Sequence, residues 1–526
     1  MERFFNTAGP VNCQKHYCLP PLRRFNLVEV LQLIDQEKYF VLHAPRQTGK
    51  TSCLRALMDY LNQEGRYLCL YINVEAAQAA RDNVKEGMRA ILSELAMNAL
   101  DDLGDDFFQQ RWVTILEEHG EFMAFQQALS GWAKHAAAPL VLLIDEVDAL
   151  VGDTLISLLR QLRGGYTKRP ERFPQSIILC GVRDVRDYRI HSSREQAIIT
   201  GGSAFNVKAA SLRLEDFSRS EVETLYRCHT DATGQLFTPD AIDQVWELSE
   251  GQPWVVNALG YEVCFEMQTG KTRSRSITSE MVQQAKESLI LRREIHIDQL
   301  VDKLREERVR RVIEPILLGL DDPETLSIDD VGYVRDLGLI KTEGNLRIAN
   351  RLYQEVIPRE LTYTTQVTIS HHTQWYVHAD GSLDMTKLLT AFQDFFRKHS
   401  ESWVDRFQYK EAGPHLLMQA FLARILNGGG RIEREYGLGR KRTDLFVVWP
   451  YSGGVQDIVI ELKIRYGDLG KTIQAGLEQT WQYMDICGTD EGHLVIFDRS
   501  RSTRWEEKIF CRQEQYQGHP ITVWGM

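Results

Sequence analysis

The sequence predicts an α/β protein made of several domains, and three observations carry this prediction. The chain has 526 residues, which is more than a single hydrophobic core normally serves, so about two to four domains are expected. In the N-terminal part, apolar runs alternate with helical patterns, which is typical of a parallel sheet covered on both faces. Two motifs with different chemistry lie at opposite ends of the chain, at residues 44–51 and 443–463.

Composition narrows the class of protein. Hydrophobic residues make up 43% and charged residues 26%, as in soluble globular proteins. The net charge of −11 argues against a broad electrostatic grip on nucleic acid, so any such contact must be local. The longest apolar run, 136–144, is too short to cross a bilayer, and the start does not resemble a secretory signal. We therefore expect a cytoplasmic protein without a membrane partner.

The cysteines favour the same compartment. Nine are present, and only Cys13 and Cys18 are close together. With His16 between them they could suggest zinc, but no second pair of ligands is nearby. We expect reduced thiols here rather than a metal site.

The first strand of the predicted sheet is the apolar run 39–43, which opens directly into the first motif. A helical pattern follows at 52–61, and further strands are expected at 67–74, 139–144 and 176–180. This order places the motif in the turn between the first strand and its helix.

The motif itself, Ala44-Pro-Arg-Gln-Thr-Gly-Lys-Thr51, reads as a phosphate-binding loop. Such a loop needs inward backbone N–H groups, a helix N-terminus, a lysine for the β and γ phosphates and a hydroxyl for Mg²⁺. Gly49 would allow the tight turn, Lys50 would contact phosphate and Thr51 would hold the metal. Ala44 departs from the usual glycine, which is acceptable where φ is negative. The predicted nucleotide-binding residues of this segment are Ala44, Pro45, Arg46, Gln47, Thr48, Gly49, Lys50, Thr51 and Ser52.

A second element strengthens this interpretation. The apolar run 141–144 ends in Asp145 and Glu146. A buried strand would deliver Asp145 to the sheet edge as a Mg²⁺ ligand, and Glu146 would polarise the attacking water. Alone, such a run is more often a simple strand end. Together with the loop, it predicts ATP binding and hydrolysis.

Residues 5–360 resemble the AAA+ class, in particular its STAND-like and archaeal-ATPase relatives. Asp145-Glu-Val-Asp148 is similar to their acidic strand, Arg183 occupies the place of their sensor-1 residue, and Gly251-Gln-Pro253 resembles an element of their lid. The resemblance implies ATP and Mg²⁺ as cofactors, Arg183 as a nucleotide contact, and a homo-oligomer. Arg169 and Arg172 are either trans-acting arginine fingers or solvated loop residues.

Strand signals fade after residue 212, where we expect a helical lid. A helix at 328–339 and a hairpin at 340–348 then suggest a winged helix. Its candidate recognition helix carries Asp329, Asp330 and Asp336 against Arg335, and acidic groups repel DNA phosphates. We therefore expect this module to pack the lid against the C-terminal domain. The alternative is DNA contact through the wing or Arg351.

The C-terminal motif predicts a metal site from its spacing. The runs 443–449 and 457–463 are joined by a hairpin signal at 450–454. A symmetric hairpin puts Asp444 opposite Glu461, with Cβ atoms about 4.5–5.5 Å apart. Lys463 projects from the same face as Glu461. Two carboxylates could hold Mg²⁺ while the ammonium orients water. The alternative is a cross-strand salt bridge of Lys463 with the acids.

These residues resemble the PD-(D/E)XK nuclease superfamily, over about residues 386–526. Gln479 and Tyr483 are similar to the Q-x-x-x-Y motif of its RecB-like branch, and they share one helix face. The resemblance implies a metal (Mg²⁺, with Mn²⁺ as an alternative) held by Asp444, Glu461 and Leu462. Catalytic roles follow for Asp444, Glu461, Lys463, Gln479 and Tyr483.

Two further features of this domain stay open. Either Glu411 or His415 would supply the superfamily's first-helix group. Arg440, Lys441 and Arg442 either grip DNA or form a solvated turn.

The predicted fold is therefore a multidomain α/β chain: a P-loop parallel-sheet ATPase with a helical lid, a winged-helix-like module and an α/β nuclease domain. The expected boundaries are 1–205 for the ATPase core, 206–295 for the lid, 296–365 for the winged module, 366–385 for a linker and 386–526 for the nuclease. The predicted function is an ATPase with a metal-dependent nuclease that cleaves nucleic acid, with DNA favoured, in prokaryotic genome defence, repair or mobile-element control. It would act as a homo-oligomer and could have partner proteins. The alternative is a STAND-like regulatory scaffold whose nuclease fold only binds nucleic acid or partners.

Overall fold

The structure is a computed structural model, and its chain divides into two compact units. Unit 1 comprises Met1–Asp302 and Leu326–Tyr353, and unit 2 comprises Lys303–Thr325 and Gln354–Met526. The described residues are 2–109, 111–184, 189–192, 197–200, 204–292, 294–317, 326–343, 346–361, 376–406, 418, 421–422, 431–438, 441–465, 467–498, 500 and 503–526.

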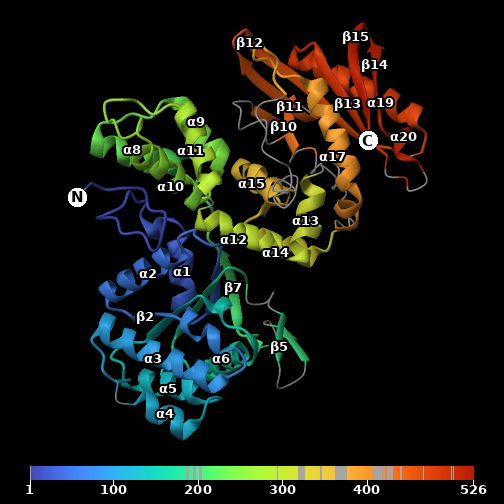
Figure 1. Ribbon diagram of the computed structural model, residues 1–526. Helices are drawn as coiled ribbons and strands as arrows, with labels where there is room; N and C mark the ends of the chain where they lie inside the picture. Colours follow the sequence, from blue (N-terminus) through green and yellow to red (C-terminus); the bar gives the residue numbers. More distant parts are fainter. Residues whose placement is uncertain are drawn as a thin grey trace. The chain divides into compact units, whose positions relative to one another are not determined.

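A five-stranded parallel sheet forms the centre of unit 1 (Figure 1). Its strands, in spatial order, are β2 (Leu68–Asn73), β3 (Leu140–Asp145), β4 (Ser176–Gly181), β1 (Tyr39–His43) and β7 (Lys208–Arg213). All neighbouring pairs are parallel. The four strands predicted from the sequence are confirmed. β7 was not predicted, because an edge strand with mostly half-buried residues has no apolar run to reveal it.

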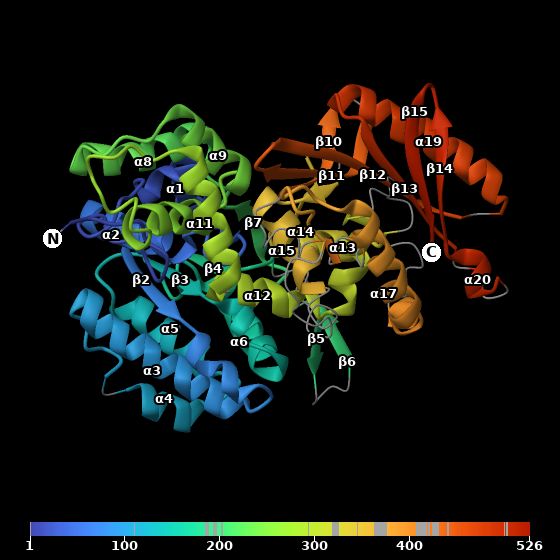
Figure 2. The same cartoon turned by 45° about the horizontal axis from the view of Figure 1, so that its top comes forward.

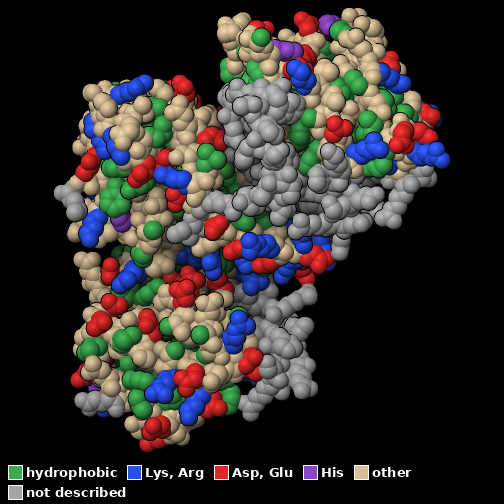
Figure 3. All heavy atoms as spheres, viewed as in Figure 1, with side chains coloured by type: hydrophobic (Ala, Val, Ile, Leu, Met, Phe, Trp, Pro, Cys, Tyr) green, Lys and Arg blue, Asp and Glu red, His purple; other side chains and the backbone are tan. Residues whose placement is uncertain are grey.

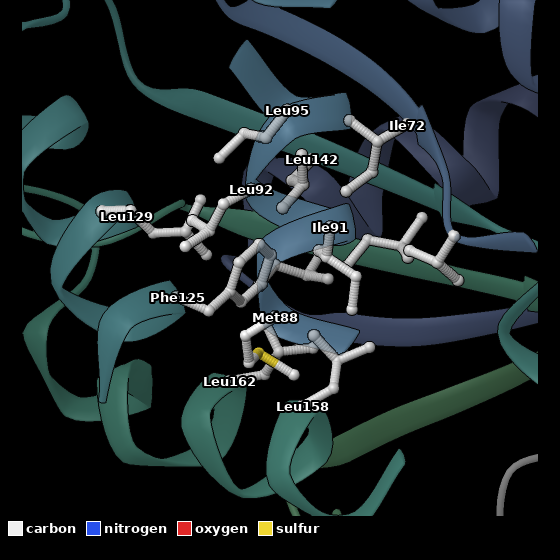
Figure 4. Close-up of a cluster of buried hydrophobic side chains, with 14 of the residues drawn as sticks. Ile72, Met88, Ile91, Leu92, Leu95, Phe125, Leu129, Leu142, Leu158 and Leu162 are labelled. Carbon is white, nitrogen blue, oxygen red and sulfur yellow. The ribbon is translucent and has the colours of Figure 1, made fainter. Parts of the chain in front are cut away.

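Helices cover both faces of this sheet. On one face, α3 (Val84–Leu103), α5 (Ala124–His135) and α6 (Gly152–Gly165) pack against β2 and β3. Figure 4 shows this core, where Met88 and Leu92 of α3 meet Phe125 of α5 and Leu142 of β3. On the other face lie α1 (Leu27–Asp35) and α2 (Lys50–Glu64). The remaining elements of this region are α4 (Trp112–His119), the short helices η1 (Pro21–Arg23), η2 (Glu75–Ala80), η3 (Val147–Ala149) and η4 (Tyr166–Lys168), and the hairpin β5 (Arg189–Ser192) and β6 (Ala197–Thr200).

A helical subdomain follows β7. It consists of α8 (Arg219–Thr233), α9 (Pro239–Ser249), α10 (Pro253–Tyr261), the single π-turn η6 (Glu262–Glu266) and α11 (Ser279–Arg292). Ser218 and Glu221 form a reciprocal capping box at the start of α8. After α12 (Ile295–Leu304), the chain returns to unit 1 with α14 (Ile328–Asp336), the short antiparallel pair β8 (Ile340–Lys341) and β9 (Arg347–Ile348), and the start of α15 (Arg351–Leu361). The predicted helix and hairpin are therefore present.

The N-terminal segment corrects one expectation. Cys13 and Cys18 form a disulfide, whereas we expected reduced thiols. The loop between them brings their Cα atoms to 5.2 Å, within the span of a disulfide. Sequence spacing alone could not show this proximity.

Unit 2 contains α13 (Glu307–Leu317), α17 (Met385–Arg406) and a six-stranded mixed sheet. Its spatial order is β10 (Arg431–Leu438), β11 (Lys441–Tyr451), β12 (Gly454–Ile464), β13 (Glu491–Phe497), β15 (His519–Gly525) and β14 (Phe510–Tyr516). The helix α19 (Leu469–Cys487) connects β12 to β13, which run parallel, and α20 (Trp505–Lys508) precedes β14. The hairpin of β11 and β12 and the helix that carries Gln479 and Tyr483 were predicted; β10 was not.

Apolar side chains pack on both faces of this sheet. α17 packs on one face through residues such as Phe392 and Phe396, together with Ile460 and Leu462 of β12. α19 packs on the other face with Val459 of β12 and Leu494 of β13, and it lies across the strands in Figure 2. Since Ile460 and Leu462 face α17, strand alternation turns Glu461 and Lys463 toward α19.

The surface mixes charges of both signs. On the face shown in Figure 3, Lys and Arg side chains are interspersed with Asp and Glu in each unit. Among the described residues, no helix combines the length and apolar character needed to span a bilayer.

Candidate active sites

The predicted phosphate loop lies between the end of β1 and the start of α2. The backbone N–H of Ala44 donates to the carbonyl of Gly181 at 3.2 Å, which ties the loop to β4. Gly49 is the N-cap residue of α2 and has φ of +95°, a conformation that strongly favours glycine. The first N–H groups of α2 thus stand at the loop, as an anion site requires.

Lys50, the predicted phosphate-binding lysine, has a buried side chain. Its Nζ donates to the carbonyls of Ala44 at 2.9 Å and Pro45 at 3.0 Å. The side chain is buried because the backbone of the loop places two carbonyl oxygens beside the ammonium. These bonds hold the cation inside the loop.

Asp145 and Thr51 meet across the sheet edge. Thr51 Oγ1 donates to Asp145 Oδ2 at 2.6 Å, and Tyr71 OH donates to the same oxygen at 3.1 Å. Asp145 has no exposed surface. The hydroxyl and carboxylate oxygens are the hard ligands that Mg²⁺ prefers, so this pair fits the implied metal.

Glu146 follows Asp145 in a left-handed conformation, with φ of +57°. Such a backbone is uncommon for a non-glycine residue and often marks a functional position. Burial is the main cause that raises the pKa of the Glu146 carboxyl, while Lys50 lowers it and Asp145 raises it further. A carboxyl with a raised pKa is a better proton acceptor than an exposed one.

Asp148, also in the acidic motif, has a structural contact. Its Oδ1 accepts a hydrogen bond from the backbone N–H of Val182 at 2.7 Å. This bond fixes the segment after β3 to the segment after β4.

A cavity opens beside the phosphate loop. Three segments line it: the N-terminal stretch, including Thr7 and Arg24; the loop, including Thr48 and Gly49; and the helical subdomain. From the last come Phe217, Leu225, Pro253, Trp254 and Asn257. Sequence reasoning missed Arg24, Trp254 and Asn257; the only local signal was the Gly251-Gln-Pro253 element directly before Trp254.

Two arginines singled out from the sequence, Arg183 and Arg169, each lie close to an aromatic ring. The Arg183 guanidinium lies 5.0 Å from the centre of the Tyr333 ring in α14. Arg169 folds back onto its own unit: its guanidinium lies 3.5 Å from the Tyr166 ring centre, and it donates to the Tyr166 and Glu37 carbonyls. Arg169 is thus occupied within unit 1.

The segment of α14, β8 and β9 packs directly onto the predicted phosphate loop of unit 1. Gly338, with φ of +78°, lies so close to Pro45 that an added Cβ would come within 2.6 Å of the proline ring. The strands β8 and β9 hold the helical subdomain through Glu250: Arg347 binds its carboxylate with two hydrogen bonds of 2.5 and 2.7 Å. Lys341 adds a bond to the same carboxylate at 3.3 Å. Asp336, predicted to repel DNA, is buried beside Arg335.

The hairpin of unit 2 has the predicted register. Leu445 pairs with Ile460 and Tyr451 with Gly454, around a turn at Ser452 and Gly453. Continuing this register by one residue puts the backbone of Asp444, within β11, opposite Glu461. The side chains of residues 441–444 lie outside the description, as do Glu411, His415 and Arg440.

Four predicted site residues form one chain of hydrogen bonds. Glu461 is buried, and its Oε1 accepts from Lys463 Nζ at 2.8 Å. Lys463 Nζ also donates to Gln479 Oε1 at 2.8 Å, and Gln479 Nε2 donates to the hydroxyl of Tyr483 at 3.0 Å. These bonds connect β12, which carries Glu461 and Lys463, to α19, which carries Gln479 and Tyr483. Leu462 lies between them, with a buried side chain on the α17 face.

Within the described residues, no group of three or more His, Cys, Asp and Glu side chains gathers as a metal site would require. The predicted nuclease metal rests on Asp444, whose side chain lies outside that set.

Comparisons with known proteins concern the N-terminal part. Residues 34–188 match the family model described as AAA domain. No curated protein matches the chain. Among solved structures, the chain is similar to a Walker-type ATPase of Pyrococcus abyssi, at 16% identity over 67% of this chain and 99% of that one, with a TM-score of 0.45.

Two further solved structures are similar at lower scores. Cdc6p of Pyrobaculum aerophilum shares 13% identity over 69% of this chain and 96% of its own, with a TM-score of 0.35. The Drosophila ORC bound to DNA shares 12% identity over 73% and 80%, with a TM-score of 0.35. The family match coincides with the observed parallel sheet, phosphate loop and acidic strand end. Residues 34–188 therefore form an AAA domain, the ATP-binding module of AAA-type ATPases.

Proposed function

We propose that this chain hydrolyses ATP in unit 1 and cleaves nucleic acid in unit 2, with Mg²⁺ at both sites. The observation that supports the first activity is the meeting of Thr51, Asp145 and Glu146 beside the loop. The second activity rests on the chain of hydrogen bonds from Glu461 through Lys463 and Gln479 to Tyr483.

In the ATP site, each side chain has a distinct task. The α2 N–H groups and Lys50 bind the phosphates, and Lys50 exchanges its bonds with the Ala44 and Pro45 carbonyls for phosphate oxygens. Thr51 and Asp145 would hold Mg²⁺, which supplies charge neutralisation on the phosphates. Glu146 accepts the proton of the attacking water, for which its raised pKa is suitable. Arg183 is proposed as a further contact to the nucleotide.

In the nuclease site, Asp444, Glu461 and Leu462 would hold the metal, which supplies Lewis acidity toward the phosphodiester. Lys463 orients water or stabilises the charge that develops on phosphate. Gln479 fixes the ammonium of Lys463, and Tyr483 fixes Gln479. Glu461 is buried beside Lys463, and a metal ion would add a second positive charge to balance this buried carboxylate.

The proposed substrate is nucleic acid, with DNA favoured, and the proposed setting is prokaryotic genome defence, repair or mobile-element control. The named relatives include an ORC bound to DNA. We further propose a homo-oligomer in the cytoplasm, with partner proteins as an added possibility. The mixed surface charge fits a local contact with nucleic acid rather than a broad one.

One observation favours a second candidate function. Lys463 and Glu461 form an ion pair of 2.8 Å, as the structural alternative requires. If Glu461 and Lys463 form only this ion pair and hold no metal, unit 2 binds nucleic acid or partner proteins without cleaving them. The chain is then a scaffold that its AAA domain regulates.

A single experiment separates the two candidates. Purified protein is incubated with linear and circular DNA and RNA, with Mg²⁺ or Mn²⁺, with and without ATP. Metal-dependent cleavage that disappears in Glu461→Gln supports the nuclease. Binding of nucleic acid without cleavage under every condition establishes the scaffold, and ATP turnover in the same preparation tests unit 1 independently.

A further inference from the structure

Arg24 is a charged residue of the N-terminal stretch that no motif of the sequence assigns a role. It follows η1 and lines the cavity beside the phosphate loop. The side chain is half-buried, so its charge is partly withdrawn from water. A cation held in this way needs partners, and its partners indicate its task.

The Arg24 guanidinium joins two segments that are distant in sequence. Its Nη1 donates to the carbonyl of Thr48 at 3.2 Å, and its Nη2 donates to the carbonyl of Glu215 at 2.5 Å. Thr48 belongs to the phosphate loop and Glu215 begins the segment that enters the helical subdomain. The planar guanidinium presents several donors in fixed directions, which suits two carbonyls from separate segments.

The ring of Phe217 holds the guanidinium from another side. It lies 4.3 Å from Arg24 Cζ, a distance at which a cation and an aromatic face attract. Phe217 also lines the cavity. Arg24 therefore connects the segment that leads into the helical subdomain, which contains Glu215 and Phe217, to the phosphate loop.

The position relative to Gly49 links Arg24 to the phosphates. A Cβ built on Gly49 would lie 3.7 Å from Arg24 Nη1, so the guanidinium stands directly at the left-handed turn that begins α2. This turn sets the direction of the N–H groups that bind phosphate. A positive charge here also attracts an anionic ligand in the cavity.

We infer that Arg24 is a positioning residue for the nucleotide, which holds the turn at Thr48 and Gly49 in its phosphate-binding shape and adds positive charge for the polyphosphate. This inference rests on the proposed ATP site. It assigns a role to a residue outside the loop, the acidic strand and the sensor position.

The test compares ligands that differ in phosphate. Binding of ATP, ADP and adenosine is measured by competition with a fluorescent ATP analogue, for wild type, Arg24→Ala and Arg24→Lys. Arg23→Ala is the matched control, since Arg23 is adjacent and exposed. Thermal melting establishes that each variant is folded.

Arg24→Ala should weaken ATP and ADP by about tenfold or more, the loss expected for hydrogen bonds that involve a charge. Adenosine should change by less than about threefold, because it carries no phosphate for the charge to act on. Arg24→Lys should recover part of the ATP affinity through its charge, and Arg23→Ala should equal wild type.

Equal losses for ATP and adenosine would reduce Arg24 to a structural clamp and overturn the inference, as would unchanged ATP affinity in Arg24→Ala. If Arg24→Ala does not fold, the test uses Arg24→Lys, which lacks the planar guanidinium. A ratio of ATP affinity to adenosine affinity equal to that of wild type then counts against the inference. A wild-type protein that binds no ATP would instead refute the proposed function itself.

Discussion

The hydroxyl of Thr51 donates a hydrogen bond of 2.6 Å to the carboxylate of Asp145, although 94 residues separate them in the chain. Thr51 lies in the first turn of α2 and Asp145 ends β3. Parallel strands bring their carboxyl ends to one edge of a sheet, where ligands of such folds bind. This bond brings the phosphate-loop motif and the acidic end of β3 together in one site.

Lys50→Ala should lower ATP affinity by about tenfold or more, because it removes the cation inside the loop. The Ala44 and Pro45 carbonyls would lose their donor, so a modest fall in melting temperature is also expected. Nucleotide titration and thermal melting measure the two effects. Lys85→Ala, an exposed lysine of α3, serves as control. Unchanged ATP binding by a folded Lys50→Ala protein would reject the loop assignment.

Glu146→Gln should keep ATP binding and lose turnover, since the amide preserves shape but cannot accept the proton. The raised pKa of Glu146 adds a pH prediction. The carboxylate is the active form, so wild-type turnover should fall as pH decreases through this pKa, and at a higher pH than an exposed glutamate would give. Residual turnover of Glu146→Gln should lack that step. A variant that loses binding as completely as Lys50→Ala contradicts these separate roles.

Gly338→Ala should destabilise unit 1 and weaken ATP binding. A Cβ would meet Pro45 at 2.6 Å, and the positive φ adds its own penalty. Gly234→Ala is the matched control: Gly234 has φ of +75° and no neighbour within 4 Å of a Cβ, so it pays only the backbone cost of about 1 kcal/mol. The clash should add about 1–3 kcal/mol for Gly338→Ala. Equal unfolding free energies in the two variants would show that the contact with Pro45 yields easily.

Glu250→Ala should release the β8–β9 strands from the helical subdomain. It removes both hydrogen bonds to Arg347 and the bond to Lys341, with an expected loss of about 1–2 kcal/mol. Hydrogen exchange at residues 340–348 should rise. Glu247→Ala, which removes only the 3.8 Å pair with Arg351, should change little. Equal exchange in the two variants would argue against this clamp.

Asp444→Ala and Glu461→Gln should each abolish metal-dependent cleavage and leave ATP turnover largely intact, because the two sites lie in different units. Lys463→Ala should spare metal binding more than the acid variants do, and still block cleavage. Glu478→Gln, on the exposed face of α19, is the control. Cleavage that persists in Glu461→Gln would exclude the proposed metal role of this carboxylate.

Much of this molecule is predictable from local pattern. Apolar runs identify β1 to β4, because buried parallel strands are continuous in hydrophobicity. The hairpin register that pairs Leu445 with Ile460 follows from a two-residue turn and strand alternation. Gln479 and Tyr483 share a helix face by spacing alone, and they are hydrogen bonded.

Tertiary structure decided what spacing cannot encode. The packing of Gly338 on Pro45, the hydrogen bonds of Arg347 to Glu250 and those of Arg24 to Thr48 and Glu215 all join segments far apart in the chain. Periodicity reports which face of an element is buried, and it carries no information on which distant element covers that face. The sequence by itself therefore determined the two chemical motifs and the local elements that carry them. Only the folded chain determined which residues surround each motif, because a contact between distant segments depends on the path of the whole backbone.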